Sequence, residues 1–303
     1  MRQRAYAKIN LSLDVIRRRE DGYHDLEMIM VPVNLYDTLD FQFADQMKII
    51  RNVRYLPMDK RNTIIKAIEI LREEFGFREN FEIVLKKHIP TQAGLAGGSA
   101  DGAAVIRALN RMLGLGMNLA KMLELGKKVG ADVPFCVASR PARVTGIGEQ
   151  LEFFHVRTPF FILLVKPYKG VSTRTAFETL DFSSAVHPDG QRMRQALMSG
   201  NYPEVVASLG NTLEQSAFRL VPQIEKIKQE LLAMGFDGAL MSGSGSTVFA
   251  LTQNEELLEL GARKMARKAA FIRKTTIRPE SATRKRPASR LEDQAENSSE
   301  DNA

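Results

Sequence analysis

The sequence predicts an α+β fold. Some segments place apolar residues at every second position, which is typical of strands with one buried face. Other segments place them three and four positions apart, which is typical of helices that bury one face. The two kinds of segment do not alternate regularly, as they would in a doubly wound parallel sheet. The chain has 303 residues and is therefore long enough for two domains.

The first expected strand is YAKINLSLDVI, near the N-terminus. One of its faces carries aliphatic residues: Ile9, Leu11, Leu13 and Val15. The other face carries Lys8, Asn10 and Ser12, so we expect a strand with one buried face. Further strands are expected, in chain order, in DLEMIMVPVNLYDTLDFQF, FEIVLKKHI and FFILLVKP. The segment GALMSGSGSTVFAL is typical of two strands joined by a glycine turn.

Five segments have helical spacing. The first three are RNTIIKAIEILREEFG, ADGAAVIRALNRML and NLAKMLELGKKVG, of which the first is expected to stop at Gly76 and the third at Gly130. The other two are IEKIKQELLAMGF and EELLELGARKMARKAAF. We expect the last helix to continue until the C-terminal tail begins.

The composition is that of a soluble globular protein, with 44% hydrophobic and 26% charged residues. No stretch has the length of a membrane span, and the N-terminus lacks the apolar core of a signal peptide. A single cysteine, Cys136, excludes an intramolecular disulfide and fits the cytoplasm, where we expect the protein. Four histidines and one cysteine offer no metal-ligand cluster, so no protein metal site is predicted. The net charge of +7 permits an anionic ligand.

The C-terminal region is basic and then acidic. Basic residues crowd between positions 263 and 290, and the last segment is LEDQAENSSEDNA. Residues 280–303 contain almost nothing apolar to bury and are predicted to form a disordered tail. A basic run is compatible with nucleic-acid binding, but no aromatic residues are interleaved with it. A solvated end is favoured, and we expect neither a nucleic acid nor a membrane as partner.

A glycine-rich loop, PTQAGLAGGSAD, runs from Pro90 to Asp101 directly before an expected helix. Glycines let backbone N–H groups turn inward together, and the first N–H groups of a helix attract anions. The loop is therefore suited to phosphate, although it lacks the lysine of G-x-x-x-x-G-K-[ST] and does not match G-x-G-x-x-G. Glycine content alone leaves a second interpretation open, a simple turn before a buried helix.

Three segments resemble, in order, the three motifs of the GHMP kinases, named for galactose, homoserine, mevalonate and phosphomevalonate. They are AKINLSLDV, PTQAGLAGGSADGAA and MSGSGSTVFAL. The segments REDGYHDLEM and GADVPFCV resemble the members of this family that phosphorylate a cytidine-diphosphate-linked methylerythritol in the non-mevalonate isoprenoid pathway. The resemblance covers about residues 5–275. It implies an N-terminal domain over 1–157, similar to the second domain of ribosomal protein S5, and a ferredoxin-like C-terminal domain over 158–279.

The resemblance implies that the glycine-rich loop wraps the phosphates of ATP, which is used together with Mg²⁺. The expected ATP-binding residues are Pro90, Gly94, Leu95, Ala96, Gly97, Gly98, Ser99 and Ala100. Ser99 is expected to reach a phosphate oxygen or Mg²⁺, or to cap the helix at its start. The loop is expected to lie outside the core.

The same resemblance makes Asp132 the candidate general base and Lys8 its catalytic partner. Lys8 would keep Asp132 ionised or polarise the attacking hydroxyl, because phosphoryl transfer needs positioning and charge neutralisation more than covalent chemistry. Asn10, on the same strand face, would bind the substrate or the base. Without the resemblance, Asp132 would simply form a turn between Gly130 and Pro134, and Lys8 would face the solvent.

The GYH segment resembles a cytidine site. Tyr23 would stack on the base, His24 would read its edge, Phe177 would form the opposite wall, and Thr175 lies nearby. The alternative is that Tyr23 and Phe177 are ordinary core aromatics.

The sequence departs from the family pattern at three places: Gly102 replaces alanine, Ser246 replaces proline, and residues 139–141 read Ser-Arg-Pro. The first hypothesis is ATP-dependent phosphorylation of the 2-hydroxyl of the cytidine-linked substrate. The second is a GHMP kinase for another small alcohol or an isoprenoid monophosphate. The third is a nucleotide-binding homologue without turnover. The sequence leaves the oligomeric state open.

Overall fold

A computed structural model describes residues 1–53 and 56–279. The tail predicted for residues 280–303 lies outside the described residues. The described strands are β1 Arg2–Arg18, β2 His24–Ala44, β3 Lys48–Arg51, β4 Asn80–Lys86, β5 Ala142–Gly146, β6 Gln150–Phe153, β7 Phe161–Lys166, β8 Gly210–Asn211, β9 Gly238–Met241, β10 Val248–Thr252 and β11 Phe271–Thr276. The described helices are α1 Thr63–Phe75, α2 Gly97–Met112, α3 Leu119–Val129, α4 Val133–Ala138, α5 Thr173–Glu178, α6 Gly190–Ser199, α7 Tyr202–Ala207, α8 Glu214–Leu220, α9 Gln223–Ala233 and α10 Glu255–Met265.

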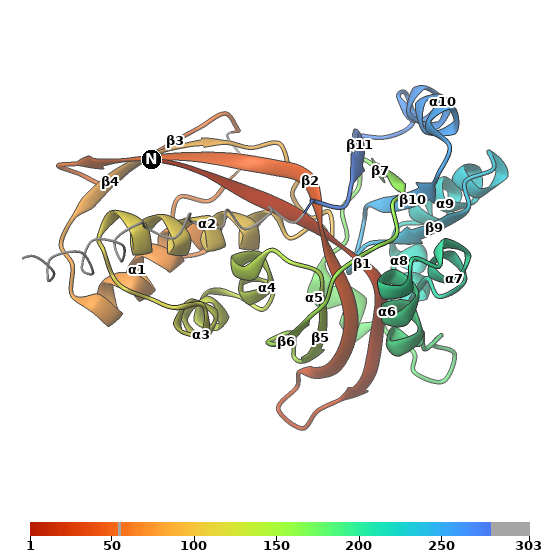
Figure 1. Ribbon diagram of the computed structural model, residues 1–303, viewed down its shortest axis with the longest axis horizontal. Helices are drawn as coiled ribbons and strands as arrows, with labels where there is room; N and C mark the ends of the chain where they lie inside the picture. Colours follow the sequence, from red (N-terminus) through yellow and green to blue (C-terminus); the bar gives the residue numbers. More distant parts are fainter. Residues whose placement is uncertain (54–55, 280–303) are drawn as a thin grey trace, which may run out of the picture.

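The first sheet is built around two long antiparallel strands, β1 and β2, which cross the molecule in Figure 1. Its strand order is β3-β4-β2-β1-β8, and β5 pairs with both β2 and β6. The helices α1, α2, α3 and α4 gather beside this sheet, and α2 packs on β1. This arrangement brings the start of α2 next to the middle of β1.

The expectation that β1 buries one face was wrong, because both faces are buried in its middle. Lys8, Asn10 and Ser12 are 4%, 0% and 0% exposed. The aliphatic face belongs to the core with α2, and the loop after β9 covers the opposite face near Lys8 and Asn10. A cation and an amide are therefore held inside the protein, which requires polar partners for both.

The second sheet has the order β11-β7-β10-β9, and all its pairs are antiparallel. Helices α9 and α10 lie beside it in Figure 1. Strand β11 was missed by the sequence, which predicted helix up to Phe271. Helix α10 ends at Met265, and residues 271–276 pair with β7, whose edge they complete. The hairpin of β5 and β6 was not predicted either.

The two sheets are joined by backbone contacts. Strand β8 follows the second sheet's β7 in sequence but pairs in parallel with β1 at Ser12 and Leu13. Val33 forms an isolated bridge with Ile277, and the Arg278 N–H donates to the carbonyl of Pro32 at 2.8 Å. The division at residue 157 falls between β6 and β7, but the position of β8 keeps it a prediction. The predicted α+β class is confirmed. In the part of the chain that the structure describes, no helix has both the length and the apolar character needed to span a membrane.

Candidate active site

The three sequence motifs meet through hydrogen bonds that backbone carbonyls of the glycine-rich loop accept. The Lys8 N–H on β1 donates to the Leu95 carbonyl in the glycine-rich loop at 3.2 Å. The Ser242 hydroxyl, after β9, donates to the Gly94 carbonyl at 3.0 Å. The Thr247 N–H donates to the Ala93 carbonyl at 3.2 Å. Segments that are separated by more than eighty residues are thus fixed against one another around one loop.

Two glycines make this close approach possible. Gly94 has φ +71°, and a Cβ at this position would lie 1.9 Å from the Ser242 carbonyl oxygen, so no other residue fits. Gly243 has φ +58°, and a Cβ there would lie 3.3 Å from Lys8 Nζ and 3.2 Å from the Gly94 carbonyl oxygen. Gly94 and Gly243 therefore allow the motifs to pack closely, whether or not a ligand is bound.

Helix α2 begins at Gly97, three residues earlier than the sequence predicted. Its N-cap is Ala96, at φ 56°, and no side chain caps the helix. Ser99 lies in the first turn, so the expectation that it caps the helix was wrong. The Ala100 N–H already bonds the Ala96 carbonyl at 2.8 Å, whereas the N–H groups of residues 97–99 precede the first intrahelical bond. These groups and the positive end of the helix dipole form a site suited to phosphate.

A cavity of about 730 Å³ joins this helix end to the polar face of β1. Of the predicted site residues it is lined by Lys8, Asn10, Asp132, Pro90, Phe177 and residues 94–99. The loop after β9 contributes Gly243, Ser244 and Gly245. Ala100, Tyr23, His24 and Thr175 are not among the lining residues. The structure therefore brings the glycine-rich loop and the predicted catalytic pair into one space.

Lys8, Asn10 and Asp132 lie together in this cavity. Lys8 Nζ donates to Asn10 Oδ1 at 2.6 Å and lies 3.8 Å from Asp132 Oδ2. The Lys8 side chain is 5% exposed, so it does not face the solvent. Asp132 is the N-cap residue of α4, but its side chain makes no capping bond. Its carboxylate, with 35% exposure, remains available to a ligand.

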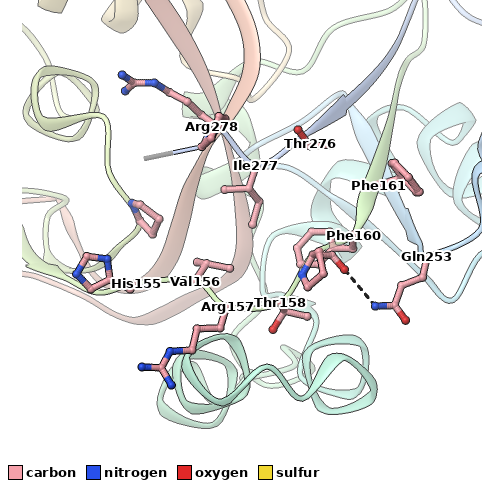
Figure 2. A pocket seen from close by; sticks show the side chains of 13 residues that line it. His155, Val156, Arg157, Thr158, Phe160, Phe161, Gln253, Thr276, Ile277 and Arg278 are labelled. Carbon is pink, nitrogen blue, oxygen red and sulfur yellow. Dashed lines mark hydrogen bonds between the residues drawn. The ribbon is translucent and has the colours of Figure 1, made fainter. Parts of the chain in front are cut away.

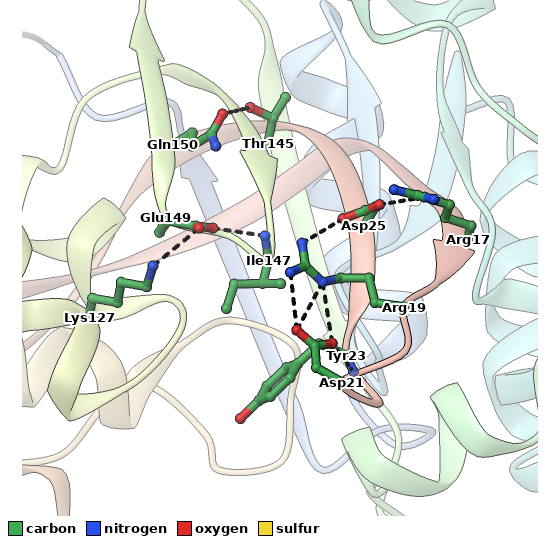
Figure 3. A network of polar contacts seen from close by, with 10 residues as sticks. All are labelled: Arg17, Arg19, Asp21, Tyr23, Asp25, Lys127, Thr145, Ile147, Glu149 and Gln150. Carbon is green, nitrogen blue, oxygen red and sulfur yellow. Dashed lines mark hydrogen bonds and ion pairs between the residues drawn. The ribbon is translucent and has the colours of Figure 1, made fainter.

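Tyr23 is not a core aromatic, because it is 61% exposed beside the turn between β1 and β2. Figure 3 shows the ion pairs of this hairpin. Arg19 lies between Asp21 and Asp25, and Arg17 Nε donates to Asp25 at 2.6 Å. Hydrogen bonds from both arginines hold the pKa of Asp25 below its usual value. The hairpin thus presents an aromatic ring to the solvent on an ordered support.

His24 contacts Phe177 directly. Their ring centroids are 4.9 Å apart with an interplanar angle of 35°, and His24 also stacks near Phe182 at 6.2 Å. Burial lowers the pKa of His24, and the charge of Arg18 adds to this effect, so the neutral ring is favoured. Thr175 lies on α5 with Phe177, where its carbonyl accepts from Thr179 Oγ1 at 2.8 Å.

Sequence reasoning missed two features that support the site, the side chain of Asn211 and a buried charge cluster. Asn211 Nδ2, on β8, donates to the carbonyls of Met241 and Gly243, both at 2.8 Å. It therefore fixes the loop after β9. The only sequence signal was an isolated amide in an otherwise irregular segment.

The second feature is a buried charge cluster formed by Lys87, Asp37 and Asp101. Lys87 Nζ donates to Asp37 at 2.5 Å and to Asp101 at 2.6 Å. The cluster lies directly beneath the start of α2, because a Cβ on Gly97 would lie 3.2 Å from Lys87 Nζ. Burial alone would lower the pKa of Lys87, but the two carboxylates outweigh it and raise that pKa. Burial raises the pKa of Asp101 to about 8.

Another cavity, of about 560 Å³, is shown in Figure 2. It is lined by residues 155–161 and by the chain after β11, and none of the predicted site residues borders it. Among the described residues no group of three or more histidine, cysteine or acidic side chains could hold a metal ion. The candidate active site is the cavity of about 730 Å³ at the start of α2, because Lys8, Asp132 and residues 94–99 line it.

Comparison with known proteins agrees with this geometry. Residues 62–140 match the GHMP kinases N terminal domain, and residues 193–270 match the GHMP kinases C terminal domain. The 4-diphosphocytidyl-2-C-methyl-D-erythritol kinase of Bacillus pumilus (strain SAFR-032) is 42% identical over 261 residues, which cover 85% of this chain and 90% of the relative. The enzyme of the same name from Bacillus cereus (strain AH187) is 41% identical over 256 residues, covering 83% and 88%.

Solved structures give the same result. A crystal structure of 4-(cytidine 5'-diphospho)-2C-methyl-D-erythritol kinase superimposes with a TM-score of 0.79 at 30% identity, covering 92% of this chain and 100% of that one. The homoserine kinase of Cytophaga hutchinsonii, at 21% identity and a TM-score of 0.68, covers 89% of this chain and 93% of its own, and shares the fold. The chain therefore belongs to the GHMP kinase family of ATP-dependent kinases.

Proposed function

We propose that this kinase transfers the terminal phosphoryl group of ATP to the 2-hydroxyl of 4-diphosphocytidyl-2-C-methyl-D-erythritol in the non-mevalonate isoprenoid pathway. The identity of 41–42% to kinases named for this substrate supports the choice of acceptor. The observation that carries the proposal is the shared cavity, in which the glycine-rich loop, Lys8 and Asp132 line one space. A phosphate at the start of α2 and an alcohol at Asp132 would be neighbours there.

In this proposal the glycine-rich loop holds the ATP phosphates, with the N–H groups of Gly97, Gly98 and Ser99 as donors. Phosphoryl transfer depends mainly on alignment and charge neutralisation, and these donors are fixed by the start of α2. Pro90 and residues 94–96 shape the loop. Ala100 does not line the cavity; its N–H closes the first helical turn.

Asp132 is proposed to accept the proton of the substrate hydroxyl. Its carboxylate lies 3.8 Å from Lys8 Nζ, so the two side chains face the same part of the cavity. Lys8 is in turn oriented by Asn10, which accepts its hydrogen bond at 2.6 Å. The Lys8 charge is also positioned to offset the negative charge of the incoming phosphates.

Mg²⁺ is proposed to accompany ATP and to neutralise charge on its phosphates. Proteins usually hold this ion through substrate phosphates and one or two carboxylates rather than in a dedicated cage. The absence of an acidic cluster among the described residues fits this mode. Asp132 and Ser99 line the same cavity and are the residues present that would contact the ion.

The cytidine base is proposed to bind near the His24–Phe177 pair. Phe177 lines the active-site cavity and contacts His24, so this pair lies at one end of it. A neutral His24 ring offers one donor and one acceptor to the edge of a base. Tyr23 is exposed beside it and would stack from the solvent side, while Thr175 would play a supporting part on α5.

The test is phosphorylation of the acceptor by purified protein. We expect ADP and a phosphorylated product in equal amounts with 4-diphosphocytidyl-2-C-methyl-D-erythritol, and far slower turnover with homoserine or mevalonate. Comparable or faster turnover of a simpler alcohol would favour a GHMP kinase with a different acceptor. ATP binding without any ADP formation would favour a nucleotide-binding homologue without turnover.

A further inference from the structure

A second polar pocket lies at the far end of α4 from Asp132. It has a volume of about 370 Å³. The residues that define this arginine pocket are Arg2, Arg4, Tyr6, Arg107, Ser139 and Arg278. They come from β1, from α2, from the residue after α4 and from the chain after β11. No aspartate or glutamate lines the pocket.

The guanidinium groups are held in place by neutral partners. Arg107 donates from Nη1 to the Cys136 carbonyl at 2.7 Å and from Nη2 to the Arg4 carbonyl at 3.0 Å. Arg278 Nη1 donates to the carbonyl and the hydroxyl of Ser139, both at 2.9 Å. These bonds fix the side chains but leave their charges uncompensated.

Two neighbouring tyrosine rings contact the guanidinium groups of Arg278 and Arg4. The Arg278 guanidinium lies 4.1 Å from the centre of the Tyr6 ring, and that of Arg4 lies 4.8 Å from the centre of the Tyr36 ring. The two rings are 5.2 Å apart. Arg278 also borders the neighbouring cavity of Figure 2, in which its side chain extends away from Ile277.

The pocket concentrates positive charge. Among the residues described, Arg4, Arg107 and Arg278 form no ion pair with a carboxylate, whereas Arg2 pairs with Asp40 at 2.7 Å. Burial lowers the pKa of Arg107 to about 10, and the charge of Arg278 adds to that lowering. The cations therefore repel one another, and a bound anion would relieve the repulsion.

We propose that the arginine pocket binds a small phosphorylated anion of about the size of a diphosphate, at a site separate from the ATP loop. Planar guanidinium groups match phosphate oxygens in geometry as well as in charge. The volume lies near the lower end of the range for small-molecule sites, about 300–1,000 Å³, which suits a compact ligand. Four arginines from three segments, β1, α2 and the chain after β11, line the pocket and would converge on it.

Occupancy of the pocket would reach the active site through two helices. Arg107 lies on α2, whose first turn carries Gly97 and Ser99. Its carbonyl partner Cys136 lies on α4, which begins directly after Asp132. The anion would thus fix the far ends of the two helices whose near ends line the active-site cavity.

The probe is inorganic pyrophosphate, titrated calorimetrically into the full chain in a buffer without divalent cations. Pyrophosphate can also enter the ATP loop, so variants separate the two sites. We expect Arg278→Gln and Arg4→Gln each to weaken pyrophosphate binding at the arginine pocket about tenfold or more, which corresponds to about 1.4 kcal/mol. Arg4 is exposed, so its variant keeps the fold even if Arg278→Gln does not. Binding should also weaken as ionic strength rises.

The matched control is Arg140→Gln. Arg140 lies 4.9 Å above the ring of Phe153, in a cation–π contact like that of Arg278, but it does not line the pocket. We expect it to bind pyrophosphate like the wild type. Identical isotherms for the wild type, Arg278→Gln and Arg4→Gln would overturn the proposal. So would loss of all binding in a variant of the ATP loop alone.

Discussion

The buried cluster beneath α2 makes Lys87 a residue whose removal should lower stability strongly. Lys87 Nζ is the hydrogen-bond donor shared by Asp37 and Asp101, and the three side chains are 1%, 0% and 4% exposed. Replacing Lys87 with methionine keeps the length of the side chain but leaves Asp37 without its cation and Asp101 without its hydrogen-bond donor. Breaking a buried pair in this way costs about 3–5 kcal/mol.

This loss is a large fraction of the free energy of unfolding, which is about 5–15 kcal/mol for a natural domain. For a domain of about 150–250 residues each kcal/mol lowers the melting temperature by about 2–4 °C. Lys87→Met should therefore melt about 6–20 °C below the wild type. Thermal unfolding followed by circular dichroism measures this shift.

The matched control is Lys86→Met, because Lys86 directly precedes Lys87, is the last residue of β4 and is exposed. It should melt close to the wild type. The double variant Lys87→Met/Asp101→Asn should recover part of the loss. It leaves Asp37 as the only charge of the cluster, and Asp37 keeps its bonds from the N–H groups of His88 and Ile89 at 2.5 and 2.8 Å. Equal melting temperatures for the two single variants would refute the reasoning.

Four further predictions concern the site and its support. Asp132→Asn should lower kcat by about 10²–10⁴, the span for a general base, with ATP affinity nearly unchanged; near wild-type kcat would remove Asp132 from this role. Gly98→Val should weaken ATP binding in calorimetry while the melting temperature changes little. Phe177→Ala should weaken CDP binding about 5- to 150-fold with ATP saturating, because stacking contributes about 1–3 kcal/mol; an unchanged CDP-dependent melting shift would contradict the base site. The raised pKa of Asp101, about 8 in the folded state against its usual value of 3.8, means that the folded state binds this proton more tightly. Its contribution to stability is therefore complete below about pH 4 and is lost as pH rises towards 8. In Asp101→Asn the urea concentration at the unfolding midpoint should vary less with pH across this window.

The sequence was informative where a short segment carries its own signal. The glycine-rich loop predicted a phosphate site before a helix, and α2 begins within that loop at Gly97. The strand pattern around Lys8 was also correct, but burial of its polar face was not predictable. That burial depends on the loop after β9, which follows it by more than two hundred residues.

Long-range partners explain the other failures. Lys87 is fifty residues from Asp37 in sequence, and no periodic pattern links a lysine directly after one strand with an aspartate of another strand. Strand β11 lies in a basic stretch whose composition resembles the end of α10, and pairing with β7 decides its structure. The cytidine residues were predicted by resemblance, yet the direct contact between His24 and Phe177 depends on how α5 meets the hairpin.

The two adjacent glycines at the start of α2 have different physical tasks, and this decides which variant tests ATP binding. The expectation that the loop lies outside the core fails at Gly97. A Cβ there would lie 2.9 Å from Ile89 Cγ2 and 3.2 Å from Lys87 Nζ, so a side chain would disturb the core and the charge cluster together. A Cβ on Gly98 would meet Thr63 Oγ1 at an ordinary 3.6 Å. Because both Gly98 and Thr63 line the cavity, valine at position 98 would enter the phosphate site without breaking the fold. Loss of ATP binding in Gly98→Val would thus report on the loop, whereas the same loss in Gly97→Val would report on the core.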